Sequence, residues 1–168
     1  LDFRRVLFLS TGCLLPDEGL HAVVVALQAR LATIGRLPVR VESLEIRRTH
    51  TDASTMVLYR TEATSRVDAQ QVFALAKDIP MVVGQLVTGL RGGPWGHGQD
   101  ALLAQVGGLT CRVHARSVMP ANWQMTELLA DMVLRWVQPT PGLRVLNMWA
   151  GIGVLGLLVA RAGALVTL

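Results

Sequence analysis

Three glycines near the end of the chain have the spacing of a ligand-binding turn. They are Gly151, Gly153 and Gly156 in the stretch GIGVLG, which follows an apolar stretch. Glycine permits a tight turn and lets a ligand approach the backbone at the N-terminus of a helix. The pattern G-x-G-x-x-G occurs in dinucleotide-binding turns, where the third glycine allows helix and strand to pack closely. Turns that hold S-adenosylmethionine (SAM) use glycines in the same physical way, so the glycines alone do not separate the two cofactors.

The residues before the glycines favour SAM. A SAM-binding turn needs a small residue at the end of the strand and a polar residue a few positions earlier. Ala150 directly precedes Gly151, and Asn147 lies four positions before that glycine. An Asn inside a dinucleotide-binding strand would place a polar amide in the core of a parallel sheet, where it would need a hydrogen-bond partner.

A strand, a helix and the start of a second strand are expected to position this turn. Residues 144–149 form the predicted first strand, residues 154–163 the helix and residues 164–168 the next strand. This succession is typical of a βαβ unit in a parallel sheet. An amphipathic helix over 123–137, begun by Asn122, precedes the unit. Its predicted apolar face consists of Met125, Leu128, Leu129, Met132, Val133 and Trp136.

The chain before this unit has the pattern of an α+β domain. The predicted elements are, in order, a helix over 20–34, strands over 39–49 and 55–62, a helix over 69–77 that Asp68 caps, and strands over 81–90 and 109–118. Alternating apolar and polar residues favour an antiparallel sheet with helices on one side. A glycine-rich loop over 91–100 precedes the last of these strands. A change of pattern near 117–122 predicts two domains, 1–118 and 119–168.

The composition is that of a folded protein with a modest positive charge. Of the 168 residues, 51% are hydrophobic and 17% are charged, which favours a packed core over disorder. The uncharged run 148–160 is shorter than the roughly 17–25 residues that span a bilayer, so no membrane is expected. The net charge of +4 suits nucleic acid, but charge alone does not decide the partner. Cys13 and Cys111 lack zinc-ligand spacing, and the absence of a cysteine framework predicts a cytoplasmic protein.

Longer stretches of the chain resemble a known family. From 106 to 168, and above all in SVMPAN at 117–122 and PGLRVLNMWAGIG at 141–153, the sequence resembles the bacterial RNA (uracil-5-)-methyltransferases. The helix after Cys13 resembles the one that opens the central α+β subdomain of that family. The resemblance implies a SAM-dependent enzyme that forms 5-methyluridine in 23S rRNA or tRNA, with RNA as its partner and a Rossmann-like cofactor domain. We expect a monomer, and a fragment that is truncated at both ends.

The resemblance also implies roles for individual residues. The cofactor-binding residues that it implies are Asn147, Trp149, Gly151, Gly153 and Val154. No catalytic residue is expected, because the family's nucleophilic cysteine and its base correspond to sequence beyond Leu168, and Cys111 lies on the wrong side of the turn. Cys13 corresponds to one iron–sulfur ligand of a longer parent protein, since a cubane cluster needs four thiolates.

Two departures from the family pattern keep other interpretations open. Asn147 stands where the family has Asp, and Pro120 stands where a Gln contacts SAM. A non-catalytic RNA-binding remnant would fit these changes. An NAD(P)-binding oxidoreductase fragment would fit the literal GIGVLG pattern.

Overall fold

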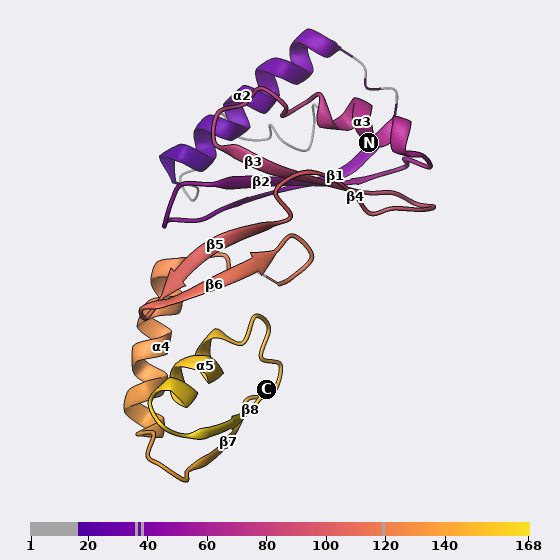
Figure 1. Ribbon diagram of the computed structural model, residues 1–168. Helices are drawn as coiled ribbons and strands as arrows, with labels where there is room; N and C mark the ends of the chain where they lie inside the picture. Colours follow the sequence, from indigo (N-terminus) through magenta and orange to yellow (C-terminus); the bar gives the residue numbers. More distant parts are fainter. Residues whose placement is uncertain (1–16, 36, 38, 119) are drawn as a thin grey trace. The chain divides into compact units, whose positions relative to one another are not determined.

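The computed structural model describes residues 17–35, 37, 39–118 and 120–168. These residues fall into two compact units (Figure 1). The first unit contains the described residues up to Arg48 together with residues 53–102, and the second contains residues 49–52 and 103–168. Each unit has its own cluster of buried apolar side chains.

A four-stranded mixed sheet forms the framework of the first unit. Its strands are β1 (Val41–Arg48), β2 (Thr55–Thr61), β3 (Val82–Thr88) and β4 (Trp95–Gly98), in that spatial order. The β1–β2 hairpin is antiparallel, as predicted, but β2 and β3 are parallel. The prediction of a purely antiparallel sheet is therefore wrong. A helix lies between β2 and β3 in the chain, and such a crossover returns the chain in the same direction.

Two helices cover one face of this sheet, α2 (Glu18–Ile34) and α3 (Arg66–Phe73), as Figure 1 shows. The buried cluster between the layers includes Val23, Leu27, Val57, Tyr59, Val72 and Val87. Inside it the Tyr59 hydroxyl donates to Gln85 Oε1 at 3.1 Å, and Gln85 Nε2 donates to the Phe73 carbonyl at 3.1 Å. Burial raises the pKa of Tyr59, so the hydroxyl keeps the proton that this network needs. These bonds tie β2, β3 and the end of α3 together.

A capping box starts α3. Ser65, not Asp68, is the N-cap, and its hydroxyl accepts a hydrogen bond from the Asp68 N–H at 3.2 Å. The Asp68 carboxylate in turn accepts from the Thr64 and Ser65 N–H groups, each at 3.0 Å. These bonds, the one from the Thr64 N–H above all, hold the pKa of Asp68 below its usual value. The carboxylate therefore adds stability at pH values above the usual Asp pKa, and this stability is lost as pH falls through the lowered pKa.

The second unit begins with a strand pair that the sequence assigned to the first domain. It contains the last four residues of β5 (Ala101–Val106) and all of β6 (Leu109–His114), α4 (Trp123–Val137), β7 (Arg144–Leu146), α5 (Val154–Arg161) and β8 (Leu165–Thr167). Ala104, Val106 and Val113 of the β5–β6 pair share one buried cluster with Trp123 of α4 and Leu158 of α5. The boundary between the compact units therefore falls at 102/103, earlier than the boundary predicted at 118/119. From the family resemblance we also expect residues 1–118 to include the RNA-facing surface, and this stays a prediction.

Helix α4 has the predicted length, but most of its predicted apolar face is exposed. Trp123 and Ala130 are its buried residues. The exposed apolar side chains on this helix are Met125, Leu128, Leu129, Met132 and Trp136. The helix thus packs through its small and N-terminal residues instead of through its apolar stripe. No helix among the described residues is long and apolar enough to cross a membrane.

The capping box yields a stability prediction. We expect Ser65→Ala to lower the free energy of unfolding by about 1 kcal/mol, because the Asp68 N–H at the start of α3 loses its acceptor. Gln70→Ala, at an exposed position of the same helix, is the matched control and should change stability by less than about 0.5 kcal/mol. Denaturant unfolding followed by circular dichroism measures both. If the two substitutions lowered the free energy of unfolding equally, the capping box would not stabilise α3 as we expect.

Candidate cofactor site

The glycine turn lies at the carboxyl end of a parallel strand pair. Strands β7 and β8 run parallel with Val145 opposite Val166, and α5 connects them, as the sequence predicted. The Asn147 N–H donates to the Thr167 carbonyl at 2.9 Å, so the pairing continues one residue beyond β7. In open α/β sheets, ligands bind at this end of the strands.

Three residues of the turn have a left-handed backbone. The φ angles are 53° at Trp149, 61° at Gly151 and 79° at Gly153. Gly153 is the N-cap of α5, and its N–H donates to the Ala150 carbonyl at 2.8 Å. Glycine adopts these angles without a steric cost, which explains two of the three positions. Trp149 is a bulky residue in a region that bulky residues rarely occupy.

The turn leaves room and backbone donors for a ligand. A Cβ at Gly151 would meet no atom within 4 Å, so this side of the turn is open. The N-cap of α5 is Gly153, and no side chain among the described residues caps this helix end. The first N–H groups of a helix have no partner within the helix, and together with the helix dipole they favour an anionic group.

Gly156 has a different role from the other two glycines, because it allows α5 to pack closely on the strand pair. A Cβ at Gly156 would overlap Leu168 Cδ2 and lie 3.0 Å from Asn147 Nδ2 and 3.3 Å from Val166 Cγ1. Gly156 was not among the site residues predicted from the sequence. The G-x-G-x-x-G spacing was the available signal, since the third glycine of that pattern serves helix–strand packing.

Asn147 follows β7 directly and is half-buried. Its side-chain carboxamide forms no hydrogen bond with other residues in the part of the chain that the structure describes. The sequence predicted a strand through Trp149, but β7 ends at Leu146, so Asn147 lies at the strand end and not within the strand. The carboxamide instead stands at the strand end with donors and an acceptor available to a ligand.

Two other predicted site residues differ in what they offer. Val154 is buried in the core cluster of the second unit, so its side chain is not available to a ligand and only its backbone N–H could serve one. Trp149 is 92% exposed. Of the five cofactor-binding residues predicted from the sequence, Val154 is therefore a core residue and Trp149 is exposed. The other three are the turn glycines and Asn147, whose carboxamide is free of hydrogen bonds to described residues.

Cys111, the cysteine among the described residues, does not add a catalytic centre to this turn. Cys111 lies in β6, half-buried against the core of the second unit, and burial raises the pKa of its thiol. It is therefore a protonated thiol at neutral pH and a poor nucleophile. Cys13 lies outside the described residues. Within those residues no three His, Cys, Asp or Glu side chains gather as metal ligands, and the iron–sulfur cluster gains no support.

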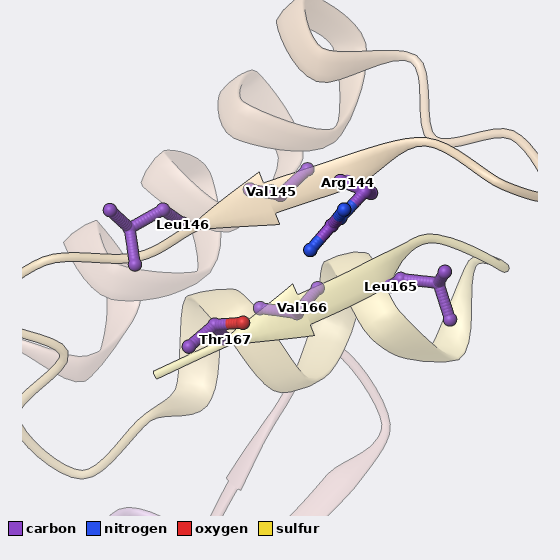
Figure 2. Close-up of a pocket in the computed structure, with 6 residues that line it drawn as sticks. All are labelled: Arg144, Val145, Leu146, Leu165, Val166 and Thr167. Carbon is purple, nitrogen blue, oxygen red and sulfur yellow. The ribbon is translucent and has the colours of Figure 1, made fainter.

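A hollow of about 590 Å³ lies along the β7–β8 pair, and Figure 2 shows the side chains that line it. The lining residues are Arg144, Val145, Leu146, Leu165, Val166 and Thr167. Leu146 and Leu165 are largely exposed. None of these residues belongs to the turn 147–153. The hollow is therefore the uncovered face of a two-stranded sheet, and the turn itself is the better cofactor candidate.

Comparison with known proteins finds similarity at the level of the fold. No protein-family model matches the chain, and no curated protein matches it. Among solved structures, the chain is similar to the tRNA (uracil-54, C5)-methyltransferase of Pyrococcus abyssi in complex with S-adenosyl-L-homocysteine. The TM-score is 0.64 at 13% sequence identity, over 86% of this chain and 38% of the other.

This similarity shows the fold. The chain has the mixed α/β fold of an RNA uracil methyltransferase over a part that corresponds to just over a third of the solved protein. The fold that the resemblance implied is thereby confirmed at this level. The sequence identity is too low to carry the substrate or the cofactor of that enzyme over to this chain.

Proposed function

We propose that this chain carries the cofactor-binding turn of a SAM-dependent RNA (uracil-5-)-methyltransferase, which forms 5-methyluridine in rRNA or tRNA. One observation carries the proposal. The open, left-handed turn from Asn147 to Gly153 lies at the carboxyl end of a parallel strand, in a fold similar to a tRNA uracil methyltransferase that holds S-adenosyl-L-homocysteine. In this proposal RNA is the partner, and the protein acts as a monomer in the cytoplasm.

The residues of the turn fit the polar groups of SAM. The uncapped N-terminus of α5 suits the carboxylate of its methionine part. The Asn147 carboxamide can both donate and accept, so it suits a hydroxyl or an ammonium group. Gly151 has the free space that a close backbone approach requires. When bound, SAM supplies an electrophilic methyl group.

Methylation of uracil at C5 also needs a nucleophile and a uracil that the enzyme can reach. By the resemblance, a cysteine thiolate adds to C6 so that C5 can attack the methyl group. The base must be single-stranded or flipped out of a duplex. Cys111 does not suit the thiolate role, because it is packed in the core with a raised pKa. We therefore assign cofactor binding, and not the nucleophile, to the described residues.

One observation favours the dinucleotide alternative. Gly156 packs α5 against the β8 end, as the third glycine of a dinucleotide fingerprint does. The same contact serves helix packing in a methyltransferase, and the similar solved structure holds S-adenosyl-L-homocysteine. SAM is therefore the cofactor that we propose, and NAD is the control ligand.

A binding measurement tests this proposal. We expect the chain to bind SAM with a dissociation constant above tens of micromolar, because Pro120 cannot supply the hydrogen bond of the family's Gln. Gly153→Ala should weaken binding at least tenfold, which is about 1.4 kcal/mol. An added Cβ would stand at the N-terminus of α5, 3.1 Å from Leu168 Cδ1, on a backbone with φ of 79°. NMR titration up to millimolar SAM provides the measurement.

Gly142→Ala is the matched control for this experiment. Gly142 also has a positive φ, 87°, and a Cβ there would meet no atom within 4 Å. Both substitutions should lower stability by about 1–2 kcal/mol, but only Gly153→Ala should affect SAM. Saturable NAD binding by the unaltered chain, without a response to SAM, would contradict the proposal and would indicate that the turn binds a dinucleotide.

Methyl transfer by this chain alone is not expected. The reason is the state of Cys111, whose half-buried thiol cannot act as the thiolate. Incubation with radiolabelled SAM and bulk rRNA that lacks the modification is the measurement. Label at C5 of uracil would contradict the inference that this chain alone supplies no nucleophile.

A further inference from the structure

The turn contains one residue whose presence the fold does not explain. Trp149 lies between β7 and α5, is 92% exposed and has a φ of 53°. A left-handed backbone brings Cβ close to the carbonyl oxygen, so a bulky residue is disfavoured there. Gly151 and Gly153 adopt the same region two and four residues later without this cost. Glycine would therefore be the least strained residue at position 149 as well.

Packing does not compensate for this strain. The other tryptophans in the described part of the chain contrast with Trp149. Trp123 is buried, Trp95 is half-buried against Gly93, and Trp136 is exposed but lies within a regular helix. No ring contact between described residues involves Trp149. The indole thus contributes little to the fold while its backbone carries strain, and such outliers concentrate at functional sites.

The surroundings of the ring suit a nucleobase in an anionic strand. An indole with open faces can stack on any base, and aromatic stacking is a principal means of holding single-stranded RNA. From Gln138 to Leu168 the chain contains Arg144 and Arg161 but no Asp or Glu. The segment that carries the ring therefore has no carboxylate that would repel phosphate groups.

From these observations we propose that Trp149 stacks on a base of the RNA substrate, beside the cofactor turn. This inference rests on the proposed function, since it names the contact through which the same site receives RNA. It also changes the role of Trp149, which the resemblance counted among the cofactor-binding residues. A ring that is held away from the protein is better placed for an incoming strand than for a ligand lying in the turn.

The test measures binding of a fluorescein-labelled ten-nucleotide oligouridylate to the full chain by fluorescence anisotropy. We expect Trp149→Gly to weaken binding at least about fivefold, which is the lower end of base–aromatic stacking. Trp149→Phe, which keeps an aromatic face, should stay within about twofold of the unaltered chain. Trp136→Ala is the matched control at another exposed tryptophan and should change nothing. An abasic oligonucleotide of the same length should bind the unaltered chain and Trp149→Gly equally, because it has phosphates but no bases.

Thermal stability provides a second measurement, because a ring that only supports the fold would have the opposite effect on it. Thermal unfolding of Trp149→Gly should begin no earlier than that of the unaltered chain, because the substitution relieves a left-handed backbone. A clearly earlier transition would show that the ring supports the turn, which would overturn the proposal. Trp149→Asn is the second variant, since Asn tolerates this region and cannot stack as an indole does.

The remaining outcomes separate this inference from the proposed function. Unchanged oligouridylate binding in both Trp149→Gly and Trp149→Asn overturns the stacking role. So does weaker SAM binding with unchanged RNA binding, which would place the ring on the cofactor. A change in self-association measured by sedimentation would place it in a protein contact and overturn the proposal as well. An effect of Trp149 on RNA binding without any SAM binding would overturn the proposed function and support the stacking role.

Discussion

The second unit depends on a backbone constraint, the left-handed turn between Leu146 and Val154. The chain must leave β7, reverse and enter α5 close enough to β8 for the helix to cover one face of the strand pair. Positive φ angles at Trp149, Gly151 and Gly153 provide the reversal, and the missing Cβ of Gly156 permits the close approach. The same turn ends at the N-terminus of α5, so the constraint that closes the fold also forms the helix end to which we assign an anionic group of the cofactor in our proposal. Structure and candidate chemistry share one set of residues here.

Local sequence signals predicted the elements well where pattern and turn agreed. The β7–α5–β8 unit follows from an apolar run, a glycine turn and a second apolar run, all within one short segment. The sheet of the first unit did not follow in the same way. The parallel pairing of β2 with β3 depends on the crossover through α3, which alternation within a strand does not encode. Strand β4 was missed because Trp95–Gly98 is half glycine, and β5 because ALLAQV shows little alternation.

For the site, residue types were predictable and their environments were not. The spacing of the glycines indicated a ligand-binding turn, and the structure gives Gly151 and Gly153 the angles that only glycine adopts easily. Whether a side chain faces ligand or core depends on packing between elements distant in sequence. Val154 therefore proved to be a core residue, and the apolar stripe of α4 proved to be exposed. The positive φ angle of Trp149 could not be predicted from the sequence. Most residues with a positive φ are glycine, and nothing in the sequence indicates that a tryptophan adopts this conformation.

Because we expect the cofactor to bind weakly, cofactor binding cannot be the interaction that holds the turn in its conformation. A ligand stabilises a protein by RT ln(1 + [L]/Kd), so a cofactor present at a concentration equal to its dissociation constant adds only about 0.4 kcal/mol. A strained, exposed Trp149 is not offset by so small a contribution. The turn must therefore be fixed by protein contacts that exist without the ligand, chiefly the burial of Val154 and Leu158 of α5 in the core of the second unit. A turn that is held this way presents its free donors in a fixed arrangement, and a preorganised site loses less entropy when a ligand binds. The buried side of α5 and its uncapped N-terminus are thus two consequences of one packing arrangement.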